Sequence, residues 1–330
     1  MHFRRPGARL FVVAAVSVLS ILVPGVDIMG GCQPFIIDLL MGEPIPMEMM
    51  LDDISLVRLV YVGEIHTVDR HHRVQAELLR RLTERNAKLA VGMEMFSQGQ
   101  QQVLDRWQTG KDDLSALVQE LGKEHWTNLM DYESVLLSAR DAAAPIVCLN
   151  ADDDLVRKIA RTGLDGLNES ERQQVPEGVN QIDQAHDRLL RLKLRVHKAF
   201  QNKSLDNVVL AQALRDETMA QAVIRFIESP QGKDRIMLVI AGAGHLNYGF
   251  GIPDRVQSRL DVPYRIILPS ESGELVLSEE DKRRSVPIEI THEDLRFIRR
   301  PIADYLHVIP LKEAVPHESG NTVEICRSNE

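Results

Sequence analysis

The sequence predicts an α/β fold: a central, mostly parallel sheet with helices on both faces and an inserted helical hairpin. Short apolar runs that end in glycine or a polar residue are typical of strands buried on both faces. Segments of helical period alternate with these runs, and such alternation is characteristic of parallel sheets covered by helices. The predicted strands are 58–63, 89–94, 145–150, 235–241, 264–268 and 305–310.

Helical patterns fill the intervals between these strands. Within 70–85, Val74, Leu78 and Leu82 recur at i, i+4 and i+8, which places them on one face of a helix. Between the third and fourth strands, charged helical patterns occupy a long interval. We expect a helical insertion over about 152–230, which forms a lid or an interface. The other predicted helices are 100–107, 114–121, 132–143, 180–200 and 205–228.

Composition narrows the class of protein. The chain has 330 residues, 44% of them hydrophobic and 26% charged, which are ordinary values for a globular protein. Its net charge of −9 argues against a nucleic-acid partner, because phosphate binding needs a basic surface. The three cysteines, none in a CxxC pair, argue against a disulfide framework and against a zinc or redox pair.

Residues 1–31 are predicted to be a lipoprotein signal peptide. Arginines precede the apolar stretch 10–23, which is shorter than the roughly twenty residues of a membrane span and suits a secretory signal. The alternative is a short membrane anchor. Met29-Gly30-Gly31-Cys32 resembles the bacterial lipobox, in which the cysteine is acylated. We therefore expect export, lipidation at Cys32 and a membrane-anchored place in the cell envelope. Gln33, by the same resemblance, favours the outer membrane.

Polar side chains follow four of the predicted strands: Glu64 and His66, then Glu94, then Asn150, then His245. Ligands of open α/β sheets bind beyond the carboxyl ends of the strands, so we expect these residues in one crevice. Two imidazoles and a carboxylate can bind a transition metal, which makes His66, Glu94 and His245 a candidate metal set. Alternatively, Glu64, His66, Glu94 and His245 act as acid and base on a substrate.

Other residues near these turns are weaker candidates. His72 is expected to face the crevice, and His71 to be solvated. Tyr248 lies three residues after His245, and a phenol beside a crevice can ligate ferric iron. Trp126 and Tyr132 are interpreted as packing residues.

Several motifs in order resemble the ChaN-like haem-binding uptake family. They include Gly63-Glu64-Ile65-His66, Gly92-Met93-Glu94 and His245-Leu246-Asn247-Tyr248-Gly249. The resemblance covers roughly residues 35–270, so we assign an α/β domain to 32–275. A C-terminal extension, 276–330, contains the possible added strand 305–310.

The resemblance implies a fold shared with Tiki proteases, TraB/GumN proteins and erythromycin esterases. Their two Gly-x-x-His motifs and glutamate correspond here to Gly63/His66, Gly242/His245 and Glu94. It also implies bacterial, iron-regulated lipoproteins connected with haem.

Two main hypotheses of function follow. The first is an envelope lipoprotein that binds haem and takes part in haem and iron acquisition, with haem-transfer or receptor proteins as partners and a homodimer as a possible assembly. Its candidate haem-binding residues are His66, His72, His245, Tyr248, Arg73 and Arg255. The alternative is a hydrolase that works with a divalent metal ion or by acid–base catalysis. A third interpretation is a non-catalytic envelope protein whose helical insertion makes an interface.

Overall fold

The computed structural model describes residues 33–110, 112–122, 126–200, 204–272, 279–286, 290–310, 312–316 and 322–326. The predicted signal peptide and Cys32 lie outside these residues, so export and acylation stay predictions. None of the helices within the described ranges combines the length and the apolar character that crossing a bilayer requires.

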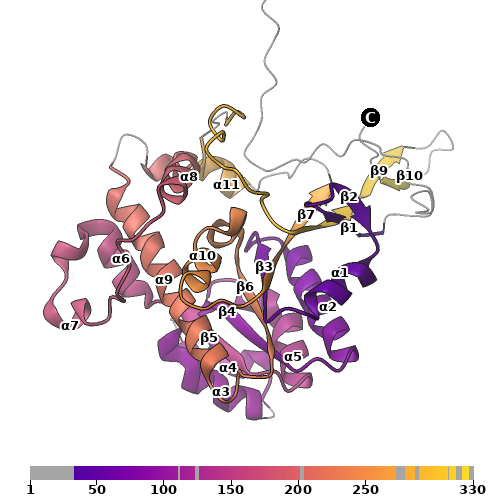
Figure 1. Ribbon diagram of the computed structural model, residues 1–330, viewed down its shortest axis with the longest axis horizontal. Helices are drawn as coiled ribbons and strands as arrows, with labels where there is room; N and C mark the ends of the chain where they lie inside the picture. Colours follow the sequence, from indigo (N-terminus) through magenta and orange to yellow (C-terminus); the bar gives the residue numbers. More distant parts are fainter. Residues whose placement is uncertain are drawn as a thin grey trace, which may run out of the picture.

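An eight-stranded sheet forms the centre of the molecule, in the order β2-β1-β8-β7-β3-β6-β4-β5 (Figure 1). The six strands from β8 to β5 run parallel, and β1 and β2 add an antiparallel edge. The strands of this sheet are β1 (Phe35–Asp38), β2 (Glu43–Ile45), β3 (Leu59–Glu64), β4 (Leu89–Ser97), β5 (Ile146–Asn150), β6 (Ile236–Gly242), β7 (Tyr264–Ser272) and β8 (Tyr305–Pro310). A separate antiparallel pair consists of β9 (Lys312–Pro316) and β10 (Thr322–Cys326).

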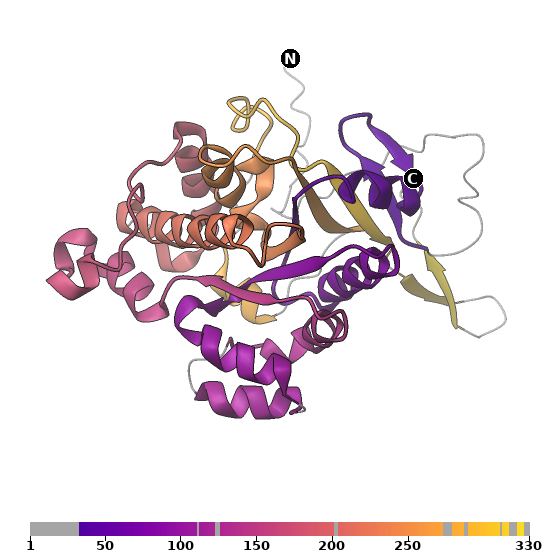
Figure 2. The same cartoon turned by 60° about the horizontal axis from the view of Figure 1, so that its bottom comes forward.

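Helices cover both faces of the sheet, as predicted. Side chains alternate between the faces of a strand, so Val60 and Val62 of β3 pack in the core on one face, and Leu59 and Tyr61 pack in the core on the other. The first core is completed by α1 (Met47–Ile54), α2 (Asp69–Glu84), α3 (Gln101–Thr109), α4 (Leu114–Leu121) and α5 (Glu133–Asp141). The second is completed by α9 (Asp206–Glu228) and α10 (Ile252–Gln257). Figure 2 shows α9 and the purple helices on opposite sides of the sheet.

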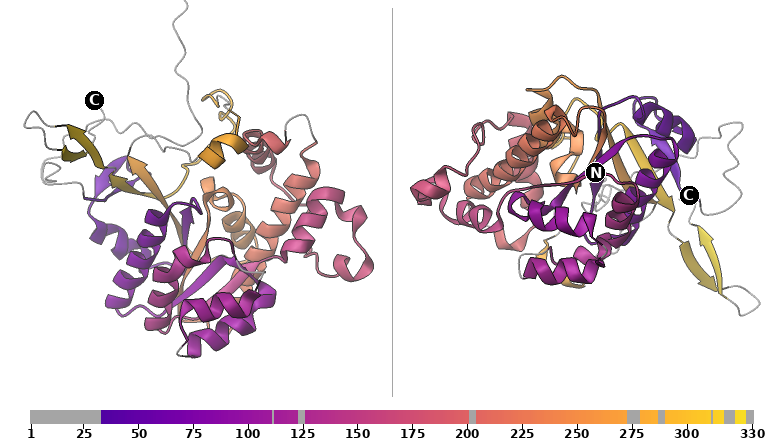
Figure 3. Two further views of the ribbon diagram at one scale, coloured as in Figure 1. Left: turned by 180° about the vertical axis from the view of Figure 1, so that it is seen from behind. Right: turned by 90° about the horizontal axis from the view of Figure 1, so that it is seen from below.

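Within the described residues, the predicted insertion is made of helices joined by loops, and its last helix, α9, also packs against the sheet. The insertion forms a lobe that contains α6 (Asp153–Thr162), α7 (Glu169–Arg172) and α8 (Gln184–Leu194). The first half of α9 packs Leu214 against Ile159 of this lobe, while its second half packs Val223 and Ile227 against the sheet. A connection between parallel strands needs a crossover, and α9 is the crossover helix between β5 and β6. Figure 3 shows the lobe far from β9 and β10.

The C-terminal segment contributes to the main sheet. Its predicted strand, Tyr305–Pro310, is β8 and lies between β1 and β7. The remaining helix of the described residues is α11 (Glu279–Arg284), and short 3₁₀ turns include η3 (Leu129–Tyr132), η6 (Ala243–His245) and η7 (Asn247–Gly249).

Candidate functional site

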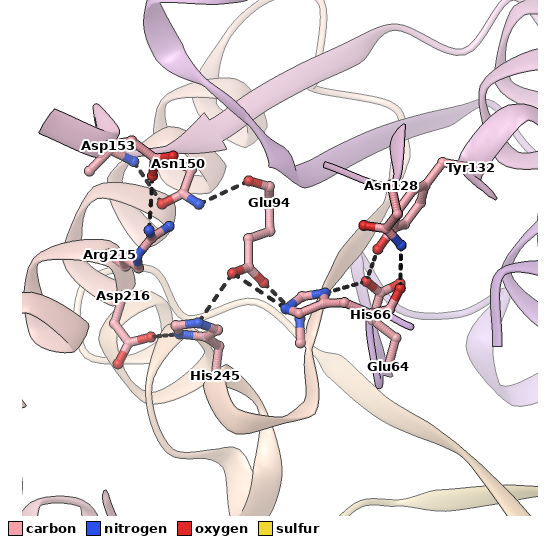
Figure 4. A network of polar contacts seen from close by, with 12 residues as sticks. Glu64, His66, Glu94, Asn128, Tyr132, Asn150, Asp153, Arg215, Asp216 and His245 are labelled. Carbon is pink, nitrogen blue, oxygen red and sulfur yellow. Dashed lines mark hydrogen bonds and ion pairs between the residues drawn. The ribbon is translucent and has the colours of Figure 1, made fainter. Parts of the chain in front are cut away.

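The carboxyl ends of β3, β4 and β6 bring His66, Glu94 and His245 together (Figure 4). The Glu94 carboxylate lies between the two imidazoles: its Oε1 atom is 3.3 Å from Nε2 of His245 and 4.0 Å from Nε2 of His66. We call these residues, with Glu64 and Asp216, the Glu94 network. Asn150 supports it from β5, because its amide donates to the Glu94 carbonyl at 3.0 Å.

Gly242, the last residue of β6, makes this close approach possible. Its backbone N–H donates to Oε2 of Glu94 at 2.7 Å. A Cβ atom at this position would lie 2.8 Å from Nε2 of His66, inside van der Waals contact. The glycine is therefore required by space at this point of the chain.

A buried carboxylate positions His66. Oε1 of Glu64 lies 2.6 Å from Nδ1 of His66, and the other oxygen accepts from Gln75 at 2.6 Å. The hydroxyl of Tyr132 also donates to Glu64. Tyr132 was interpreted as a packing residue; it is fully buried, and it also contributes a hydrogen bond to the network. Asn128 donates to the His66 carbonyl at 2.5 Å and so fixes the turn.

Asp216 does for His245 what Glu64 does for His66. It lies on α9, is 1% exposed, and its Oδ1 atom is 2.5 Å from Nδ1 of His245. The sequence interpretation did not select Asp216 as a site residue, because it follows no strand. The available signal was the charged run Arg215-Asp216-Glu217 in the middle of a largely apolar helical pattern.

The charges of the network favour two protonated imidazoles around an ionised carboxylate. Burial lowers the pKa of His245, but the adjacent Glu94 and Asp216 outweigh it and raise that pKa to about 10. Burial also opposes protonation of His66, yet the hydrogen bond to Glu64 and the charge of Glu94 raise its pKa. Conversely, the two imidazoles overcome the effect of burial on Glu94 and hold its pKa well below the usual range. The network can therefore exchange protons and stabilise negative charge.

The predicted metal set does not fit a metal ion in this arrangement. Across the described ranges, no three His, Cys, Asp or Glu side chains form a group that could hold one. The Nδ1 atoms of His66 and His245 are occupied by carboxylates, and both Nε2 atoms are directed at the same Glu94 oxygen. Cys148 is not a nucleophile here, since burial raises its pKa to about 12.

Two histidines of α2 lie elsewhere than expected. His72 does not face an open crevice: it is fully buried and stacks on Tyr132 with ring centroids 4.0 Å apart. His71, expected to be solvated, is also buried, and its Nδ1 accepts from the Ile65 N–H at 3.0 Å. His71 therefore supports the turn between Glu64 and His66, and His72 packs against Tyr132, which binds Glu64.

The two arginines proposed for haem propionates are engaged outside the Glu94 network. Arg73 is exposed and pairs with Asp69 on the same helix. Arg255 is 8% exposed, and its guanidinium donates to Glu217 at 2.5 Å. The structure does not bring either guanidinium to the imidazoles.

Tyr248 belongs to a different cavity. Tyr248 lines a pocket of about 600 Å³ together with residues from the start of β7 and from 300–304. None of the residues that line this pocket belongs to the Glu94 network. The backbone of Tyr248 has φ +63°, a left-handed conformation that is uncommon for residues other than glycine. The pocket lining includes Tyr264, Arg265, Ile266, Arg300 and Ala303.

Comparisons with known proteins identify the family. A family model described as haem-binding uptake, Tiki superfamily, ChaN matches residues 50–256, more than half of the chain. The protein RETICULATA-RELATED 5, chloroplastic, of Arabidopsis thaliana is 24% identical over an alignment of 292 residues, and the match covers 81% of this chain. The chain spans only 36% of that relative's length.

One solved structure shares the fold at low sequence identity, and another is similar at a lower TM-score. The structure described as cofacial heme binding to ChaN of Campylobacter jejuni superposes with a TM-score of 0.58 at 19% identity, covering 83% of this chain and 95% of that one. An erythromycin esterase, EreC, in its open conformation superposes with a TM-score of 0.43 at 14% identity, covering 84% and 78% of the two chains.

Proposed function

Since the chain belongs to the ChaN family of haem-binding uptake proteins in the Tiki superfamily, we propose that it binds haem, with Tyr248 as the axial ligand. The observation that carries this proposal is that the half-buried residue Tyr248 lines a pocket of about 600 Å³. Ligand pockets typically measure about 300–1,000 Å³, and a tyrosine phenolate ligates haem iron in catalase.

The pocket offers the other groups that haem needs. Ile266 and Ala303 contribute apolar residues to the lining, and Arg265 and Arg300 are also among the lining residues. Arg300 pairs with Asp254 through one N–H of each terminal nitrogen and keeps further donors for a propionate. In this proposal Arg300 takes the role that the sequence interpretation gave to Arg73 and Arg255, because the guanidinium of Arg265 is bound to Asp53. Haem, when bound, would supply the iron chemistry, and this chain would supply the ligand and the pocket.

Titration with hemin tests the proposal. The wild-type protein should give a saturable shift of the Soret band, and Tyr248→Phe should weaken binding at least about tenfold because the iron loses its oxygen ligand. Tyr264→Phe is the matched control, since it removes another hydroxyl from the same pocket lining. His245→Ala should keep the shift. A wild-type protein without a saturable shift, or equal losses in both tyrosine variants, would exclude Tyr248 as the ligand.

The cellular role is part of the same proposal. Acyl chains on Cys32 would hold the protein on a membrane of the cell envelope, where it would pass haem to transfer or receptor proteins. A homodimer that shares haem is a compatible assembly. Palmitate labelling of the wild-type protein and of Cys32→Ala checks the anchor: labelling that survives the substitution would exclude it.

A second function, acid–base hydrolysis, is favoured by the Glu94 network itself. Glu64 and Asp216 each hold one imidazole by Nδ1, which leaves both Nε2 atoms facing Glu94. In such a hydrolase the neutral form of His66, oriented by Glu64 or Glu94, would take a proton from the attacking water and then give it to the leaving group. The His245 imidazolium would stabilise the negative charge that develops on the substrate. Turnover of an ester and peptide panel that Glu94→Gln abolishes would support this function. Turnover unchanged by that variant would argue against it.

A further inference from the structure

Helix α8 places two basic side chains against the turn that carries His245. His186 and Lys193 are seven residues apart, two helical turns, and so lie on one face of α8. Nε2 of His186 lies 3.9 Å from Oδ2 of Asp216, the residue that holds His245. Lys193 is close enough for its charge to lower the pKa of His186. The lobe therefore adds groups to the His245 side of the site.

Lys193 is tied to this turn through Asn247. In the orientation that satisfies both ends of its amide, Asn247 donates to the Ala243 carbonyl at 2.8 Å and accepts from Nζ of Lys193 at 2.9 Å. Ala243 opens the 3₁₀ turn that ends at His245. Through Asn247, the ammonium group is thus tied to the backbone turn that positions the imidazole.

The ammonium group lacks a counter-charge among the described residues. No carboxylate in the described ranges pairs with Lys193, and Asn247 uses one of the three donors of the ammonium. Burial accordingly lowers the pKa of Lys193 to about 8. A half-buried lysine with unused donors is stabilised by an anion that approaches it.

The accessible surface of the Glu94 network has the same preference. The imidazoles are its exposed part, at 33% for the His66 side chain and 12% for that of His245. The carboxylates lie beneath them, and the side chain of Glu94 is 3% exposed. A ligand that reaches the network therefore meets the imidazole rings before it meets the carboxylates.

We propose that Lys193 is an anion-binding residue of this site, and that the ligand of the Glu94 network carries a carboxylate or phosphate group. The anionic group binds Lys193, which orients the rest of the ligand over His245 and His66. This inference rests on the second function proposed above only in treating the Glu94 network as a ligand site. It assigns the chemical class of the ligand.

Chemical protection of the lysine is the direct test. The full-length mature protein is treated with a trace of acetic anhydride, with and without inorganic phosphate or acetate as the probe, and acetylation is read by mass spectrometry. Lys193 should be protected by one or both probes. Lys233, exposed in the turn before β6, is the internal control and should react equally in all samples.

Calorimetric titration with the same probes completes the test. Lys193→Gln should weaken binding about tenfold or more, because a charged hydrogen bond is lost, and Lys193→Arg should keep most of it. Lys233→Gln should bind as the wild type does. Protection by phosphate alone assigns a phosphate-bearing ligand, and protection by acetate alone a carboxylate.

Two outcomes would overturn the inference: equal protection of Lys193 and Lys233, or binding that Lys193→Gln leaves unchanged. Haem binding and hydrolysis are measured separately. If both of those are absent while anion binding still depends on Lys193, the proposed functions fail and the anion site stands.

Discussion

Asp216 accepts from Nδ1 of His245 at 2.5 Å, and this contact directs the opposite nitrogen of the ring to Glu94. The imidazole therefore lies between two carboxylates that are almost completely buried. If His245 were neutral, both carboxylates would lose a cationic partner. The protonation of His245 is thus a property of the fold and can be tested without knowing a ligand.

Asp216→Asn should lower the pKa of His245 from about 10 by roughly one to three units. The amide oxygen can still accept the hydrogen bond, but the negative charge is gone. NMR titration of the His245 ring protons measures the change. Asp153→Asn is the control, because Asp153 is an exposed carboxylate that pairs with Arg215 at the edge of the same network (Figure 4). A similar pKa shift in both variants would contradict a specific role of Asp216.

The raised pKa of His245 also predicts how stability depends on pH. In the unfolded chain the imidazole titrates near 6.5, and in the folded protein near 10. Its contribution to the free energy of unfolding is therefore complete below about pH 6.5 and declines as pH rises towards 10. Urea denaturation at pH 7 and pH 9.5 should show a larger loss in the wild type than in His245→Gln.

The comparison with His245→Gln isolates this contribution from other groups. Lys193, whose pKa is lowered to about 8, changes stability in the opposite direction over the alkaline range. His66 contributes in the same direction as His245, so part of the wild-type loss should persist in the variant. Identical losses in the two proteins would show that His245 is not charged in the native state.

A methyl group at position 242 should disturb the site more than the fold. The new Cβ of Gly242→Ala would meet the partly exposed ring of His66, which can move towards solvent. Gly242 has φ −53°, so alanine fits its backbone, and the free energy of unfolding should fall by only about 1 kcal/mol. The pKa of His66 should fall towards 6.5, because the ring moves away from Glu94.

Gly244→Ala provides the control for that substitution. A Cβ at Gly244 meets no atom within 4 Å, although the residue lies in the same turn. NMR titration of His66 should therefore be unchanged in Gly244→Ala. An unchanged His66 in Gly242→Ala would show that the ring does not occupy the position next to β6.

The sequence was sufficient for the sheet interior but not for its edge. Buried parallel strands are continuous apolar runs, and the predicted strand 305–310 coincides with β8. The edge strands β1 and β2 were not predicted, because they are short and because β2 contains Pro44, which only an edge strand tolerates. The helix α6 was also not singled out, although Asp152 caps it and Gly163 follows it.

The site residues that follow parallel strands could be predicted from the sequence, and those that lie on helices packed against the sheet could not. His66, Glu94 and His245 follow parallel strands, whose carboxyl ends meet at one edge whatever the packing outside them. Asp216 and Lys193 belong to α9 and α8. The positions at which those helices pack cannot be predicted from a short stretch of sequence. Neighbouring positions in the sequence also do not reveal whether a polar residue is buried or faces solvent, as His71 and His72 illustrate.

Arg255 gives a final prediction, about stability. The carboxylate of Glu217 is fully buried and binds two guanidinium groups, those of Arg255 and Arg259. Glu217→Gln should therefore cost about 3–5 kcal/mol of unfolding free energy, because it leaves the buried Arg255 charge without its partner. Arg259→Ala should cost about 1 kcal/mol or less, since its side chain is 37% exposed and Arg255 still neutralises Glu217. Urea denaturation near pH 7 compares the two. Equal losses would mean that Arg255 is solvated, and would return its guanidinium to the groups able to bind a ligand.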